Sequence, residues 1–210
     1  LGPSLRRALL EGDWYVFEGA AFPEFQPALH VIPTTDVHPM WRRVAGHDWG
    51  YNAPGHHLWG AVDPEGGVVI YREFGFRGLD PTEIAQSILF RQGDETLVTW
   101  ADPSIWQERR HADLSRDQIE ALQEAGKLQL SKAEQYGKAG LSTQPANNQR
   151  IAGKQRLHTL LKKRLDGVPY LRIMECCPIL IRTLRDIQID PDRTEDVLTD
   201  YLPADNTRDD

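Results

Sequence analysis

The chain has 210 residues, 40% of them hydrophobic and 26% charged, so it is long enough for one sizeable core. No apolar run approaches the ~20 residues of a membrane-spanning helix, and no signal peptide is predicted. Its two cysteines, Cys176 and Cys177, are adjacent, which does not suit the disulfide framework of a secreted domain and favours an intracellular protein. The formal net charge of −7 argues against a general nucleic-acid coat protein.

The first 39 residues differ in composition from the rest. They are rich in aromatic residues, and four prolines between Pro23 and Pro39 exclude a long helix. We therefore predict that residues 1–39 are an extended arm or linker and that residues 40–210 form the main domain.

Three strand-like runs follow between Trp41 and Phe74. Two turn-forming sequences separate them, NAPG at residues 52–55 and DPEGG at residues 63–67. Runs this short with turns between them predict an antiparallel meander of three strands.

Helices and strands alternate beyond the meander. Asp80 is the predicted N-cap of a helix that begins at Pro81, and the apolar run ETLVTWAD predicts a central strand parallel to the first. The remaining predictions are helices over residues 115–125, about 148–165 and about 178–186, and a strand over residues 169–174. The whole pattern predicts an α/β sheet with helices against its faces.

Two aspartates lie at the ends of predicted strands. Asp48 ends the first strand, and Asp102 ends ETLVTWAD just before a proline. Ligand sites in open α/β sheets gather at the carboxyl ends of strands, so we expect both carboxylates at the same rim. Two facing acids repel unless a cation lies between them. The alternative is that both are ordinary turn formers.

A third acidic group lies in the sequence ADNTRDD and contains Asp205, Asp209 and Asp210. Taken alone, this group is typical of a solvated tail.

Taken together, three segments resemble the nuclease domain of the large terminase subunit of tailed double-stranded DNA phages. They are GHDWGYNAPGHHLWGAVDPEGGVVIYREF, WADPS and CPILIRTLRDIQIDPDRTEDVLTDYLPADNTRDD, and LLEGDWYVFEGAAFPEF resembles the join to the packaging motor. The resemblance implies a ribonuclease H-like mixed sheet, a three-strand meander plus parallel strands, with helices on both faces. It also implies an endonuclease that cuts concatemeric viral DNA at the start and end of packaging.

The same resemblance implies the site and the partners. Asp48 matches the first metal-binding aspartate, Asp102 the second and Asp209 the third, with Asp205 leading the last motif; a shift by one residue would make Asp210 the ligand. The expected cofactors are two Mg²⁺ or Mn²⁺ ions. The expected partners are double-stranded DNA, the portal protein, the small terminase subunit and a covalently linked ATPase motor, in the host cytoplasm.

A basic strip precedes the acidic carboxyl-terminal segment. Residues 150–164 hold six Lys or Arg residues and no acid. Five of them are predicted contacts to the DNA backbone, with a solvated helix face as the alternative: Lys154, Arg156, Lys162, Lys163 and Arg164.

Other functions compete with the terminase hypothesis. One is another ribonuclease H-like enzyme, such as a junction resolvase or transposase core, and another is a catalytically silent domain that docks on the portal or motor. A zinc site is disfavoured because His56 and His57 are adjacent in a strand and point to opposite faces. Glu73 is either an outer metal ligand or a charge on an edge strand.

Overall fold

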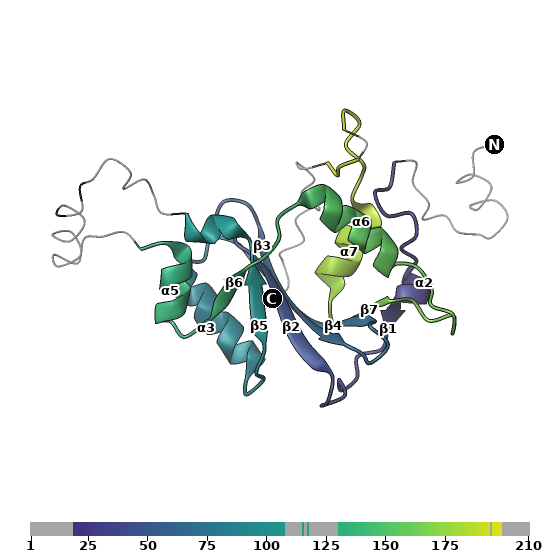
Figure 1. Ribbon diagram of the computed structural model, residues 1–210, viewed down its shortest axis with the longest axis horizontal. Coiled ribbons are helices and arrows are strands. Elements are labelled where there is room, and N and C mark those ends of the chain that lie inside the picture. Colours follow the sequence, from purple (N-terminus) through teal and green to yellow (C-terminus); the bar gives the residue numbers. More distant parts are fainter. Residues whose placement is uncertain (1–18, 108–114, 116, 118–129, 194, 199–210) are drawn as a thin grey trace, which may run out of the picture. The chain divides into compact units, whose positions relative to one another are not determined.

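The computed structural model describes residues 19–107, 115, 117, 130–193 and 195–198 (Figure 1). Except for Ser115 and Asp117, the helix predicted over residues 115–125 lies outside these ranges, and so do the acidic residues Asp205, Asp209 and Asp210. In the part of the chain that is described, no helix is both long and apolar enough to cross a membrane.

Among the described residues, seven strands form one mixed sheet in the order β1-β7-β4-β3-β2-β5-β6. Parallel pairs join β1 to β7, β7 to β4, β2 to β5 and β5 to β6. The predicted meander (β2, β3 and β4) and the ribonuclease H-like α/β class are confirmed. The strands are β1 Val31–Ile32, β2 Arg42–Asp48, β3 Gly55–Val62, β4 Val68–Phe76, β5 Val98–Ala101, β6 Thr143–Pro145 and β7 Leu171–Met174.

Local sequence signals explain several of the helices. Helix α3 begins with a capping box, in which the Asp80 side chain accepts from the backbone of Glu83 and the Glu83 side chain accepts from the backbone of Asp80. It ends at Gly93, whose positive φ of 60° suits glycine. The helices are α2 Pro27–His30, α3 Pro81–Gln92, α5 Lys132–Lys138, α6 Arg150–Leu160 and α7 Pro178–Asp186, with a 3₁₀ helix η1 at Pro103–Trp106.

Helix α6 is shorter than the prediction of about 148–165. Its hydrogen bonding gives way after Leu161 to a turn in which the Arg164 amide donates to the Val168 carbonyl at 2.8 Å. Gly167 in that turn has a φ of +83°, which ends any helical continuation.

The described residues divide into two compact units. The first unit comprises residues up to Arg42, Gly60–Glu73 and the chain from Gln149 onward, and the second comprises Arg43–Trp59 and Phe74–Asn148. Strands β3 and β4 contribute residues to both units.

The core of the first unit includes part of the predicted arm. Phe22 and Phe25 are buried there, and the Ala21 amide donates to the Ile187 carbonyl at 2.9 Å. The segment from Gly19 to Ile32 is therefore packed structure. The buried cluster consists of Ala21, Phe22, Phe25, Leu161, Leu171, Ile173, Cys177 and Leu184.

The second unit packs α3 against α5. Its fully buried side chains include Ile84 and Ile88 of α3, Ile105 of η1 and Tyr136 of α5. This core supports the strands whose ends carry the candidate site.

Candidate active site

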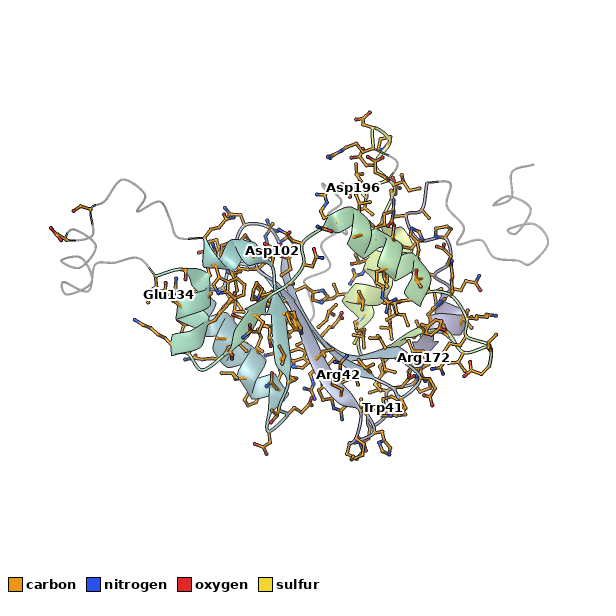
Figure 2. All side chains as sticks on the ribbon, in the orientation of Figure 1. Trp41, Arg42, Asp102, Glu134, Arg172 and Asp196 are labelled. Carbon is orange, nitrogen blue, oxygen red and sulfur yellow. The ribbon has the colours of Figure 1, made fainter. Side chains whose placement is uncertain are left out.

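The parallel pairing of β2 and β5 brings Asp48 next to Asp102. His47 pairs with Ala101 in the register, and the Asp102 amide donates to the His47 carbonyl at 3.2 Å. Asp48 is the last residue of β2, and Asp102 follows the last residue of β5. The prediction that these two strand ends are neighbours is confirmed, and Figure 2 labels Asp102 at the end of β5.

Both aspartates belong to the same, more open side of the strand pair. Along β2, Ala45 and His47 are buried whereas Asp48 is exposed, and along β5, Thr99 and Ala101 are buried whereas Asp102 is partly exposed. Since successive side chains of a strand alternate between faces, the two carboxylates share a face. They can be reached from solvent.

Helix η1 fixes the Asp102 carboxylate. Its Oδ1 accepts a hydrogen bond from the Ser104 amide at 2.8 Å, and Pro103 occupies the first position of the 3₁₀ helix. Only Oδ1 is engaged in this cap, so Oδ2 remains available to a ligand. The turn that ends the strand at Pro103 thus also orients the acid through the Ser104 amide.

The loop after Asp48 closes tightly on itself. A Cβ on Gly55 would lie 2.2 Å from the Phe76 ring and 2.7 Å from the Gly50 amide nitrogen, and a Cβ on Gly50 would lie 2.4 Å from the Ala53 carbonyl oxygen. Both positions therefore require glycine. The close approach sets the path of the chain as it leaves Asp48.

The electrostatics of Asp48 favour a bound cation. Partial burial by the surrounding protein atoms raises its pKa, the charge of Asp102 raises it further, and His56 opposes the rise. Asp48 is exposed to solvent. It accepts no hydrogen bond from any residue that the structure describes. A divalent cation would relieve the repulsion and satisfy the carboxylate oxygens.

The donor set is made of carboxylate oxygens, which suits Mg²⁺ or Mn²⁺ better than zinc. Within the described ranges, no group of three or more His, Cys, Asp or Glu side chains comes together as a metal site. The two adjacent acids fit the predicted centre, and its third ligand, Asp209 or Asp210, falls outside those ranges.

Comparison with known proteins places this geometry in a known fold. No protein-family model and no curated protein matches the sequence. The nuclease domain of the P22 large terminase superposes with a TM-score of 0.63 at 14% identity, over 87% of this chain and 84% of that domain. The chain has the fold of a large terminase nuclease domain.

A longer protein of known structure has a similar fold in part of its length. The large terminase of a thermophilic bacteriophage, in complex with ADP, superposes with a TM-score of 0.61 at 16% identity over 87% of this chain. The chain spans 41% of that protein. The resemblance inferred from the sequence is thus confirmed at the level of the fold.

Behind Asp48, the terminase-nuclease fold of this chain holds a buried row of three polar side chains. His47 Nε2 lies 2.9 Å from the Tyr136 hydroxyl, and His47 Nδ1 lies 3.3 Å from His57 Nδ1. Burial lowers the pKa of His47 to about 4, and burial together with the charges of His47 and His56 lowers that of His57 to about 2. Both histidines are neutral near pH 7.

Sequence reasoning did not identify this row. His57 is fully buried and His56 only partly buried, as expected for adjacent residues of a strand. The signal for His47 was its place one residue before Asp48, on the opposite face of the strand. Nothing in the sequence pointed to Tyr136 as the third member.

Glu73 has a structural partner in place of a metal. Its two carboxylate oxygens accept from the Ile179 and Leu180 amides, at 2.7 and 2.9 Å. These are free amides of the first turn of α7, so Glu73 caps that helix.

The predicted basic strip divides into two groups. Arg156, Lys162 and Lys163 are exposed. Lys154 is partly buried and donates to the Asp196 carbonyl at 3.0 Å, and Arg150 forms an ion pair with the Asp196 carboxylate. Figure 2 labels Asp196.

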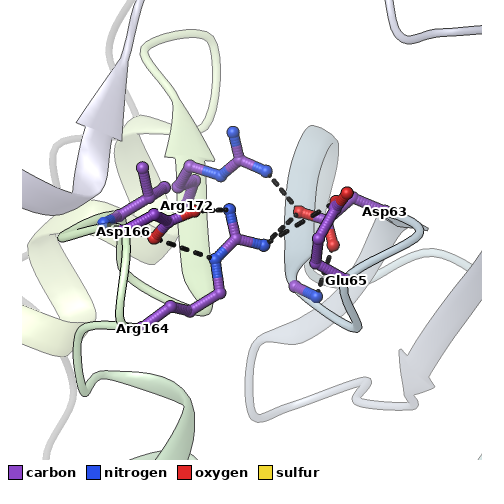
Figure 3. Close-up of polar contacts among 7 residues, drawn as sticks. Asp63, Glu65, Arg164, Asp166 and Arg172 are labelled. Carbon is purple, nitrogen blue, oxygen red and sulfur yellow. Dashed lines mark hydrogen bonds and ion pairs between the residues drawn. The ribbon is translucent and has the colours of Figure 1, made fainter.

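Arg164 belongs to an ion-pair cluster in the first unit (Figure 3). Its guanidinium lies 3.0 Å from Asp63 and 3.1 Å from Asp166, and its side chain is 12% exposed. Arg172 also binds Asp63, at 2.7 Å, and the Gly67 amide donates to Asp63 at 2.6 Å. A guanidinium held in this way has few donors left for a phosphate, so Arg164 is not among the DNA contacts that we propose.

Proposed function

We propose that this chain is the nuclease domain of a large terminase subunit and that it cuts double-stranded phage DNA in a metal-dependent reaction during genome packaging. The observation that carries the proposal is the adjacency of Asp48 and Asp102 at the carboxyl ends of β2 and β5, on an accessible face. The similarity of fold to the P22 large terminase nuclease domain supports it.

Asp48, Asp102 and Asp209 would hold the metal ions, with Asp205 and Asp210 nearby in sequence. Two Mg²⁺ or Mn²⁺ ions, when bound, would supply an activated water and neutralise charge on the leaving oxygen of a phosphodiester. The role of the chain is to hold its carboxylates ionised and oriented, as η1 does for Asp102.

The proposal extends to the partners of the domain. DNA would reach the site through an ATPase motor, and the portal protein and small terminase subunit would assemble with that motor in the host cytoplasm. Arg156, Lys162 and Lys163 are proposed to contact the phosphate backbone, and Lys154 to do so more weakly because Asp196 already holds its ammonium.

Replacing either aspartate tests the site. Asp48→Asn or Asp102→Asn should reduce nicking of supercoiled plasmid in Mn²⁺ by about 100-fold or more, since each removes a metal ligand worth several kcal/mol to the transition state. Without metal, the melting temperature should stay level or rise, because acid repulsion is relieved. Asp94→Asn is the matched control, an exposed aspartate of the second unit.

The outcomes also separate the competing functions. Nicking by both site variants at the parental rate would place the chemistry elsewhere. A parent that neither cuts DNA nor gains thermal stability from Mn²⁺ would be a silent docking domain. Strong preference for four-way junctions over linear duplex would identify a resolvase.

A further inference from the structure

We propose that Tyr136 is a positioning residue for Asp48, held in place by the buried row formed by His57, His47 and Tyr136. The inference rests on the proposed function, because it concerns the metal affinity of the same aspartate. It assigns a role to three side chains that are not themselves metal ligands.

The row crosses three elements of the second unit. His57 comes from β3, His47 from β2 and Tyr136 from α5, and their relative exposures are 0%, 5% and 0%. The His47 ring stacks on Phe76 at 5.7 Å between centroids, and the Tyr136 ring meets it edge-on at 5.1 Å. The imidazole of His47 is therefore fixed on several sides.

Fixing His47 fixes the end of β2. Asp48 is the next residue and the last of the strand, and the chain turns into the tight loop that contains Gly50 directly afterwards. The His47 carbonyl also accepts the Asp102 amide, so the same residue ties the two strand ends together. A change in the His47 ring would be transmitted through one peptide unit to Asp48.

The hydrogen bonds of the row can run in either of two orders, which differ in the nitrogen of each histidine that carries the hydrogen. In the first order, Tyr136 donates to His47 and His47 donates to His57. The ring hydrogen of His57 then lies on its Nε2 nitrogen, which is buried and has no partner in the described structure. If His57 donates to His47 and His47 donates to Tyr136, that nitrogen is a bare acceptor. The first order therefore leaves a buried N–H of His57 unpaired and the second leaves the buried O–H hydrogen of Tyr136 unpaired, so each order has one unpaired hydrogen at an end of the row.

In either order, the Tyr136 hydroxyl and His47 Nε2 share a hydrogen bond of 2.9 Å. Burial and, to a smaller extent, the charge of Asp48 raise the pKa of Tyr136, so the hydroxyl stays protonated. His47 faces the buried side of β2 and Asp48 the open side, so Tyr136 acts on Asp48 through the position of His47 at the end of the strand.

Three variants of similar volume isolate this role. Tyr136→Phe removes only the hydroxyl. His47→Gln keeps an amide nitrogen near the position of Nε2, which faces Tyr136, whereas His47→Asn keeps one near Nδ1, which faces His57. Tyr170→Phe is the control, because Tyr170 is a half-buried tyrosine of the first unit.

The measurement is Mn²⁺ affinity of the full chain, from the electron paramagnetic resonance signal of free Mn²⁺, with each protein well below its melting temperature. Tyr136→Phe and His47→Asn should weaken affinity about tenfold, as loss of an outer hydrogen-bond partner does at other metal sites. His47→Gln and Tyr170→Phe should stay within about twofold. In plasmid nicking, Tyr136→Phe should lower kcat and leave KM for DNA unchanged.

Two results would overturn the inference. One is parental Mn²⁺ affinity in Tyr136→Phe together with a lowered melting temperature, which would make the row a packing feature only. The other is equal affinity in His47→Gln and His47→Asn. If the parent itself binds Mn²⁺ no better than Asp48→Asn does, the proposed function fails instead, so the two failures are distinguishable.

Discussion

At the scale of single residues, the position of Asp48 depends on two glycines in the loop that follows it. Gly55 and Gly50 have no side chain, and each lies against backbone or ring atoms that a Cβ would overlap. The loop between them can therefore close, and Asp48 leaves β2 in a fixed direction. An acid that must meet Asp102 has to be held in this way, because the two carboxylates repel each other without a cation.

Gly55→Ala should destabilise the protein by about 1–3 kcal/mol, since the new methyl group forces the Phe76 ring or the Gly50 backbone to move. Gly153→Ala is the control: Gly153 lies inside α6 with nothing within 4 Å of a Cβ, and should gain up to about 1 kcal/mol from helix propensity. Urea denaturation measures both. Adding Phe76→Leu to Gly55→Ala should recover part of the loss, and strictly additive effects would contradict the proposed overlap.

Of the site residues, those that carry their own local signal could be predicted. Asp48 and Asp102 each lie at the end of a predicted strand, and the pairing of those strands follows from the α/β pattern. Tyr136 could not be predicted, because its contact with His47 depends on how α5 packs, which no short sequence pattern encodes. Arg164 resembled its basic neighbours in sequence, and only the fold reveals Asp63 beside it.

At the scale of elements, the helices differ in where their caps come from. Helix α3 carries its own capping box in Asp80 and Glu83, and its start was predicted at Pro81. Helix α7 has no side-chain cap at Cys177, and Glu73 on β4 accepts from its first-turn amides instead. Short elements escaped prediction: β1 and β6 have two and three residues, too few for any period to be detected.

Glu73→Gln should destabilise the protein by about 1 kcal/mol. The amide keeps one oxygen acceptor but loses the charge that interacts favourably with the amino-terminal end of α7. Glu65→Gln is the matched control, because Glu65 is 64% exposed and its 4.0 Å contact with Arg164 is a surface ion pair. Chemical denaturation of both variants at pH 7 gives the comparison, and equal stabilities would mean that Glu73 does not support the helix.

At the scale of the whole molecule, charge is distributed unevenly along a chain with a net charge of −7. Residues 185–210 contain nine acids and three arginines, and one of those acids, Asp196, binds Arg150 and Lys154. The acidic segment thus pairs with Arg150 and holds Lys154 through a backbone carbonyl. Arg156, Lys162 and Lys163 keep exposed side chains, so any electrostatic hold on DNA by the strip must come mainly from them.

If these three side chains contact phosphates, log affinity for duplex DNA should fall linearly with log salt concentration, and each lost contact should flatten the slope by about 0.9. The triple variant Arg156→Ala, Lys162→Ala and Lys163→Ala should flatten it most, without changing sequence preference. The titration belongs on the Asp48→Asn background at constant Mn²⁺, because cutting and cation binding at the acidic rim would both distort the slope. Lys138→Ala, an exposed lysine of the second unit, is the control. A parental slope in the triple variant would mean that the strip is only a solvated surface, and that DNA follows another path to Asp48 and Asp102.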